Sequence, residues 1–174
     1  MRYLLIGGLV CFSVGCSVTT QQPALHDFGL PVSVAPQQGR TLISVNAPTW
    51  LWDNRIRYRL LFASPSQLRF YGLDRWIASP PELFEQLLSS SGKTQNYVLI
   101  VKLQNFEQQF DAPDRARVVL RFSVEAYSDN NRIGTQEFYL QQPTKTPDAA
   151  GAIRGFTDLA QQADERIQGW LAGL

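Results

Sequence analysis

The thiol of Cys16 is the side chain whose sequence context points most directly to a chemical reaction. It follows a positively charged start at residues 1–3, an apolar run over residues 4–12 and the small or modest residues 13–15. A secretory leader that ends in small residues before a cysteine is typical of the site where lipoprotein signal peptidase cuts and diacylglycerol is attached to the thiol. The sequence therefore predicts a signal peptide over residues 1–15 and a lipid anchor on Cys16.

Two alternatives to a lipid anchor stay open at this point: a secreted protein with an incidental cysteine, and an uncleaved membrane anchor. The apolar run is short against the roughly 20 residues that a membrane-spanning helix needs, which argues against the uncleaved anchor. Ser13 stands where lipoproteins more often have leucine, and Ser17 stands where an aspartate commonly retains them in the inner membrane. We therefore expect delivery to the outer membrane of a Gram-negative bacterium, on its periplasmic face.

The body of the chain offers little for catalysis. Both cysteines lie within the first 16 residues, and His26 is the single histidine, so a thiol nucleophile, a zinc site or a histidine-based triad cannot be assembled. Four carboxylates show no spacing that would pair them, and no glycine-rich phosphate loop occurs; these carboxylates are Glu82, Asp111, Asp114 and Asp164. The sequence predicts a protein that is not an enzyme and that uses no cofactor and no metal.

Charge narrows the range of partners. Lys and Arg number 16 against 15 Asp and Glu, and loss of Arg2 with the leader leaves 15 of each sign. A balanced chain has no basic field to gather phosphates, so nucleic acid is not an expected partner. With 174 residues, of which 44% are hydrophobic and 18% charged, the chain has the length and composition of one globular domain.

Alternation of apolar and polar residues predicts most of the secondary structure. Strands are expected over residues 28–35, 41–47, 55–62, 67–71, 97–106, 117–127 and 132–140. The first two are expected to join through a turn at 36–39, the next two form a hairpin, and the strand over 97–106 is central in the sheet. Residues 129–131, Asp-Asn-Asn, supply the turn of a second hairpin.

Two amphipathic helices complete the predicted elements. Ser79 and Glu82 have the spacing of a capping box around Pro80, and a helix of about three turns follows. A longer helix opens at Pro147, with Thr146 as its expected cap. The order of elements predicts an α+β fold, with an antiparallel sheet packed by two helices in a single domain. Residues 16–27 are expected to be a lipidated tether and residues 28–174 the domain.

Residues suited to contact with a partner gather after the second predicted strand. Trp50 and Trp52 flank Leu51 in a loop, where two large rings are costly to expose unless a partner or the membrane surface covers them. The alternative is that an irregular strand buries at least one of the rings in the core. Only the first interpretation makes Trp50 and Trp52 candidates for partner binding.

Basic residues extend this candidate surface. Arg55, Arg57 and Arg59 alternate along the next strand and could meet acidic groups of a partner or lipid headgroups, although such a row is more often a solvated face. Arg75 and Trp76 fit a stacked pair that supports the entry to the first helix, in preference to a contact site, because arginine stacks well on indole.

Residues 48–59, PTWLWDNRIRYR, resemble the ABC-type transport auxiliary lipoprotein family, whose pattern there is Pro, an aromatic residue, Leu and then Ile-x-Tyr-Arg. Residues 68–71, 75–76 and 167–171 resemble further segments of that family, so the likeness covers nearly all of the expected domain. The family often has Asp-Arg-Pro where this chain has Trp52-Asp53-Asn54.

The resemblance implies a non-enzymatic lipoprotein that moves lipid between the inner and outer membranes together with MCE-domain proteins and an ABC transporter, or with a Pqi-type tunnel. The expected partners are the membrane, reached through Cys16, and MCE-domain or Pqi-type membrane proteins, with a homo-oligomer left open. The alternative function is a stand-alone envelope lipoprotein that binds lipid in a groove of its own, between sheet and helices.

Overall fold

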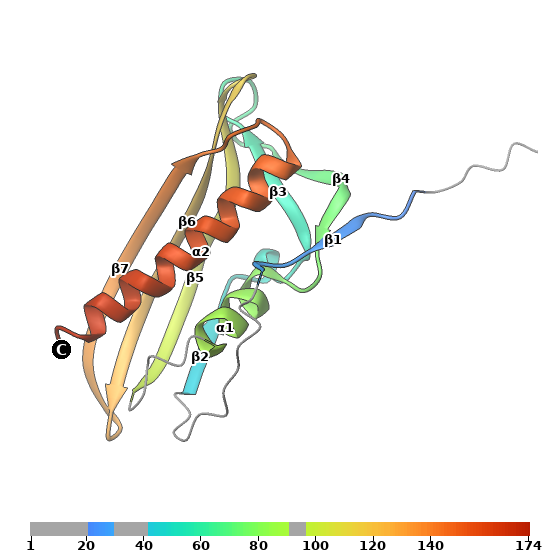
Figure 1. Ribbon diagram of the computed structural model, residues 1–174. Helices are drawn as coiled ribbons and strands as arrows, with labels where there is room; N and C mark the ends of the chain where they lie inside the picture. Colours follow the sequence, from blue (N-terminus) through green and yellow to red (C-terminus); the bar gives the residue numbers. More distant parts are fainter. Residues whose placement is uncertain (1–20, 30–41, 91–96) are drawn as a thin grey trace, which may run out of the picture.

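The computed structural model describes residues 21–29, 42–90 and 97–174. They form one domain in which a seven-stranded sheet carries two helices on the same face, as Figure 1 shows. The predicted α+β class is confirmed. The leader and Cys16 lie outside the described residues, as does most of the strand predicted over 28–35, whose residues 28 and 29 are not in a strand.

The sheet has the strand order β1-β4-β3-β5-β6-β7, and β2 also pairs with β5. The strands are β1 Ala24–His26, β2 Leu42–Asn46, β3 Arg55–Leu60, β4 Leu68–Trp76, β5 Val98–Ala112, β6 Arg115–Ser128 and β7 Asn131–Pro143. β5 is central, as predicted.

The sheet is mixed rather than wholly antiparallel. β1 pairs with β4 in parallel, and both β2 and β3 pair with β5 in parallel. The reason is the path of the chain, because α1, Pro80–Ser90, connects β4 to β5 and a connection through a helix can bring the chain back parallel to an earlier strand. Sequence alternation carries no information on this choice.

The segment predicted as a tether contributes to the sheet. Residues Ala24–His26 form β1, which pairs with Asp74, Arg75 and Trp76 of β4. A three-residue edge strand has no detectable period, so the prediction of a tether up to residue 27 does not hold for these residues. The sheet begins before the expected start of the domain at residue 28.

The predicted turn at residues 129–131 and the first helix are confirmed, whereas the turn predicted at 36–39 lies outside the described residues. Asp129 and Asn130 have φ values of 49° and 63°, which is the left-handed pair that a two-residue hairpin requires. At the start of α1, the Glu82 carboxylate accepts hydrogen bonds from the Ser79 backbone N–H at 2.8 Å and from the Ser79 hydroxyl at 2.5 Å. The Ser-x-x-Glu spacing therefore marks this helix start correctly.

The second helix, α2, spans Ala149–Leu171 and is capped by Asp148, not by Thr146 as predicted. Asp148 Oδ1 accepts the Gly151 backbone N–H at 2.8 Å and the Thr146 hydroxyl at 2.6 Å. A carboxylate can accept both donors at once and is also favoured near the positive end of the helix dipole. The helix therefore begins two residues after Pro147.

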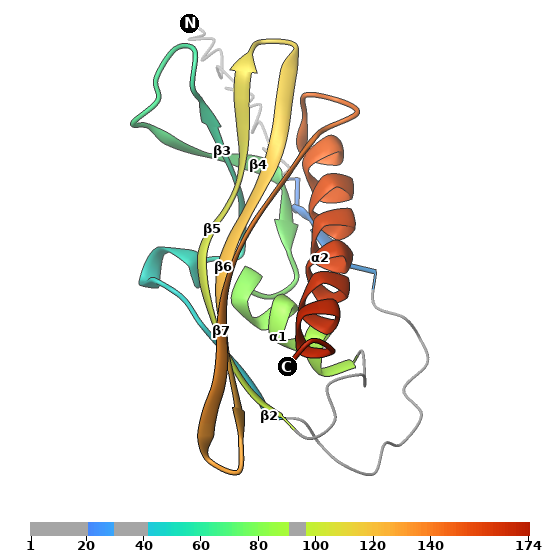
Figure 2. The same cartoon turned by 90° about the vertical axis from the view of Figure 1, so that its left-hand side faces the viewer.

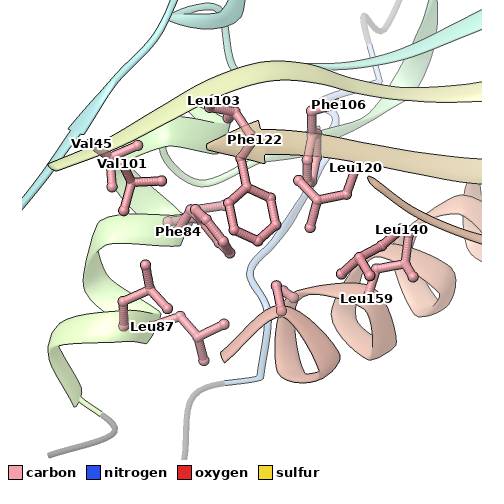
Figure 3. Packing of buried hydrophobic residues seen from close by; sticks show 14 of the residues in the cluster. Val45, Phe84, Leu87, Val101, Leu103, Phe106, Leu120, Phe122, Leu140 and Leu159 are labelled. Atoms are coloured by element: carbon pink, nitrogen blue, oxygen red, sulfur yellow. The ribbon is translucent and has the colours of Figure 1, made fainter. Parts of the chain in front are cut away.

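The core lies between the sheet and the two helices, and Figure 3 shows side chains of α1 meeting those of the sheet there. Phe84 of α1 meets Phe122 edge-on at 5.3 Å, and Phe156 of α2 stacks on Phe106 at 3.9 Å. The predicted apolar face of β6 is fully buried and comprises Val118, Leu120, Phe122, Val124 and Ala126. Each such side chain contributes on the order of 1 to 3 kcal/mol by leaving water.

Within the described ranges, neither α1 nor α2 is both long enough and apolar enough to span a bilayer.

Candidate functional site

The tryptophan loop lies where the chain leaves one edge of β5. On that edge β2 pairs with Val98–Lys102, and β3 pairs farther along with Gln108–Phe110. Between these two strands the chain forms a short 3-10 helix, η1, over Thr49–Leu51. Figure 2 shows this cyan segment projecting from the sheet on the side away from α2. We call residues 49–52 the aromatic loop.

Both rings of the aromatic loop are on the surface. Trp50 is 62% exposed and Trp52 is 47% exposed, whereas Leu51 between them belongs to the buried core. The Trp52 indole N–H donates to the carbonyl of Ala47 at 3.2 Å, which holds that ring close to the end of β2. The alternative in which one ring enters the core is therefore wrong.

Arg57 supports this loop from below. Its side chain is buried, and its guanidinium donates to the backbone carbonyl of Trp50 and, at 3.5 Å, to that of Asp53. Burial lowers the pKa of Arg57, although an arginine remains charged at neutral pH. The prediction that Arg57 lies on a solvated or partner-binding face is wrong, because the side chain is used to fix the backbone of the loop.

Arg59 is also used inside the protein. Its Nε and Nη2 each lie 3.1 Å from one carboxylate oxygen of Glu107, whose side chain is nearly buried. This two-pronged pair joins β3 to β5, and Nη1 donates to the Pro65 carbonyl at 3.0 Å. Such a pair at the edge of the core holds strands together and leaves Arg59 little freedom to meet a partner.

Arg55 has a more exposed side chain than Arg57 or Arg59, at 42%. It forms an ion pair with Asp53, and the hydrogen bond from Arg55 lowers the pKa of that carboxyl. The guanidinium carbon lies 3.7 Å from the centre of the Phe70 ring, a cation–π arrangement. Arg55 therefore presents a charged group next to the aromatic loop with its orientation already set.

Arg75 and Trp76 do not stack on each other. Trp76 is 1% exposed and packs edge-on against Phe28, Phe106 and Phe156. Consecutive residues of a strand point to opposite faces, so Arg75 points away from this cluster. It is the register partner of Arg55 on β3. Trp76 is a core residue, and Arg75 is partly exposed on the opposite face.

The seven candidate residues thus divide into two groups. Trp50, Trp52, Arg55 and Arg75 reach the surface, whereas Arg57, Arg59 and Trp76 hold the structure beneath it. The sequence argument missed the supporting role of Arg57. The only indication of this role in the sequence was that Arg57 lies a few residues after the two tryptophans. Two indole rings on a backbone fixed from below suit recognition of another surface, since their ordering is complete before binding.

A shallow hollow of about 320 Å³ opens beside β1 and α2. It is lined by Leu25, His26, Asp27, Gly29, Ile77 and Thr157. In the three described segments no three carboxylate, histidine or cysteine side chains come together as a metal site. The hollow therefore offers aliphatic surface and isolated polar groups, without a recognisable reactive centre.

Comparison with solved structures shows that the fold recurs. The chain is similar to the crystal structure of a Xanthomonas campestris protein described under the family model DUF330, with a TM-score of 0.68 and 18% identity over 84% of this chain and 94% of that one. A crystal structure of an uncharacterized protein gives a TM-score of 0.67 and 14% identity over 86% of this chain and 99% of that one. At these identities the likeness concerns the fold alone.

No family model and no curated protein matches the sequence.

Proposed function

We propose that this protein is a lipid-anchored periplasmic lipoprotein that acts as a docking component of an MCE-type or Pqi-type intermembrane lipid transport system. The leader and Cys16 support the lipid anchor, and the resemblance of residues 48–59 to the auxiliary lipoprotein family supports the transport system. The observation that carries the docking role is the pair of exposed rings at Trp50 and Trp52, held on a backbone that Arg57 fixes.

The chemistry of the aromatic loop favours a protein partner. Tryptophan and arginine dominate the binding energy of protein interfaces because a large flat ring and a rigid guanidinium fill and orient a pocket at little entropic cost. Trp50, Trp52 and Arg55 combine these features within six residues of chain. A partner that offers an apolar pocket rimmed by carboxylates would match them.

The alternative, a lipoprotein that binds lipid between its own sheet and helices, has less support. Phe156, Leu159 and Ile167 of α2 are fully buried against the sheet, and Phe106 stacks on Phe156 at 3.9 Å. The space that a lipid chain would need there is filled by side chains. A docking role does not require internal space for a lipid.

The test is crosslinking in intact cells, followed by purification of this protein from solubilised membranes and identification of what is attached. We expect an MCE-domain or Pqi-type protein with the wild type and with the matched control Phe62→Ala, which removes another exposed ring. Trp50→Ala with Trp52→Ala should reduce recovery at least about tenfold. Absence of any such partner from the wild type would contradict the proposal.

The lipid anchor is tested separately with Cys16→Ser. This change removes the one acylation site, so the protein should leave the membrane fraction and accumulate in soluble or unprocessed form. Unchanged fractionation with the outer membrane would refute the anchor, whatever the crosslinking shows.

A further inference from the structure

A second exposed surface lies on β1 and β4, close to the N-terminal tether. Leu25, Leu73 and Ile77 are 60%, 53% and 60% exposed. Leu73 lies two residues before Arg75 on β4, where the pairing with β3 is irregular, and Leu25 is the register partner of Arg75. Leu25 and Ile77 line the same hollow. We call these four residues the tether-side patch.

The charge at the centre of this patch has no partner within the described residues. Arg75 makes no hydrogen bond or ion pair there, and its Nε is buried without an acceptor. The neighbouring carboxylates already have donors, since Asp74 accepts from the His26 ring at 2.9 Å and Asp27 accepts from the Gly29 N–H at 2.8 Å. The patch therefore combines exposed aliphatic groups with a guanidinium that lacks an anion.

The tether limits how far this patch can lie from a membrane. Seven residues, 17–23, separate Cys16 from β1, so eight Cα–Cα steps lead from Cys16 to Ala24, and at about 3.5 Å per step an extended chain covers at most roughly 28 Å. β1 is the first strand after the anchor, so the tether-side patch is held close to the lipid surface. A diffusing protein partner would have to compete with that surface for the same side chains.

We propose that the tether-side patch rests on the phospholipid surface that holds Cys16, an inference that depends on the lipid anchor of the proposed function. Leu25, Leu73 and Ile77 enter the boundary between headgroups and acyl chains, and Arg75 binds a lipid phosphate. Aliphatic groups gain by burial at this depth, while arginine matches the geometry of a phosphate and can remain at headgroup level.

This contact would give the domain a defined orientation. Figure 2 shows η1 projecting from one side of the sheet while β1 lies toward the side of α2. The aromatic loop precedes Arg55 at the start of β3, and Arg75 is the register partner of Arg55, so the two surfaces flank the same end of β3.

The test uses the full acylated protein reconstituted into vesicles of phosphatidylethanolamine and phosphatidylglycerol. Cys11 leaves with the leader and the Cys16 thiol is acylated, so a cysteine introduced by Leu73→Cys or Ile77→Cys is a unique site for a fluorescent label. The matched control is Gln136→Cys on exposed β7, at the opposite end of the strand order from β1. Lipids with brominated chains quench labels at the membrane boundary.

We expect labels at 73 and 77 to be quenched at least about twofold more than the label at 136. Arg75→Gln should weaken quenching at 77, and Arg75→Lys should restore part of it because a cation is retained. Equal quenching at all three positions, with the protein still bound to vesicles, would contradict the membrane contact of the tether-side patch and leave the lipid anchor standing. Quenching that appears only after a protein partner is added would also overturn it.

Failure of the protein to float with the vesicles would overturn the lipid anchor, and the patch with it.

Discussion

Tryptophans occur in two contrasting regions of this domain. Trp76, at the end of β4, is 1% exposed and meets three phenylalanines, whereas Trp50 and Trp52 in the aromatic loop are 62% and 47% exposed. Each region depends on buried neighbours, because Leu51 and Arg57 hold the aromatic loop from below as Phe106 and Phe156 hold Trp76 in the core.

The support is buried in both regions, so burial of the ring itself distinguishes the core from the candidate binding surface. In the core the ring itself leaves water and contributes to the free energy of unfolding. In the aromatic loop the buried support contributes to the free energy of unfolding. The exposed rings contribute mainly to the free energy of binding, when a partner covers them. Mutations in the two regions should therefore separate stability from binding.

The largest effect is expected at Phe156, which covers Trp76 from α2. Phe156→Ala removes a fully buried ring stacked at 3.9 Å on Phe106 and should lower the free energy of unfolding by about 3–5 kcal/mol. The matched change Arg154→Ala, on the exposed side of the same helix, should stay within about 0.5 kcal/mol. Denaturant unfolding measures both, and equal small losses would mean that α2 is not packed as described.

The double change Trp50→Ala with Trp52→Ala should do the opposite. Partner binding should weaken by about 2 kcal/mol or more, roughly 30-fold in the dissociation constant. The free energy of unfolding should change by about 1 kcal/mol or less, because Trp50 and Trp52 are 62% and 47% exposed and lie outside the core. Thermal melting measures the stability of this variant, and pull-down measures its partner binding. Intact binding with a large loss of stability would mean that the two rings act as core residues and not as a binding surface.

Replacement of Arg57 should moderately lower both the stability of the domain and its binding to a partner. Arg57→Met keeps the buried volume but removes the donors to the carbonyls of Trp50 and Asp53, which should cost about 1–2 kcal/mol of stability. The freed loop should show lower tryptophan fluorescence anisotropy and weaker partner capture. Arg55→Met is the control for the anisotropy alone, since its guanidinium binds the Asp53 side chain and not the loop carbonyls. Unchanged anisotropy in Arg57→Met would refute the supporting role.

The smallest effect concerns the cap of α2. The Thr146 hydroxyl and the Gly151 N–H lower the pKa of Asp148 below its usual 3.8, so its stabilising contribution is present above that pH and is lost as the pH falls through the lower folded value. Asp148→Ala should cost about 0.5–1 kcal/mol at neutral pH, given its exposure. This difference from the wild type should vanish in strong acid, and a difference that persists there would point to another cause.

Local sequence patterns predicted the local structure well. The Ser79–Glu82 spacing, the Asp129–Asn130 turn and the apolar face of β6 depend on residues close together in the chain, and the structure bears out each of them. The cap of α2 was missed by two residues because Thr146 and Asp148 are both residue types that cap helices, and in the structure the Asp148 carboxylate accepts from both Gly151 and Thr146.

The candidate site was only partly predictable. The exposed tryptophans and Arg55 were found from residue type and position, but the same reasoning grouped Arg57 and Arg59 with them. Alternation along β3 says which residues share a face and not what covers that face. The carbonyl of Trp50, which holds Arg57, lies in the loop before β3, and the carboxylate of Glu107, which holds Arg59, comes from β5, 48 residues along the chain.

The sequence by itself determined the α+β class, because periods of about two and about 3.6 residues specify strands and helices without reference to the rest of the chain. It also supplied the basis for expecting a lipid anchor at Cys16. Only the tertiary structure decided that β2 and β3 run parallel to β5, that β1 joins β4, and that Arg57 and Trp76 are buried. These features depend on contacts between segments that are distant in the sequence. Such contacts form, and contribute free energy, only when the chain folds.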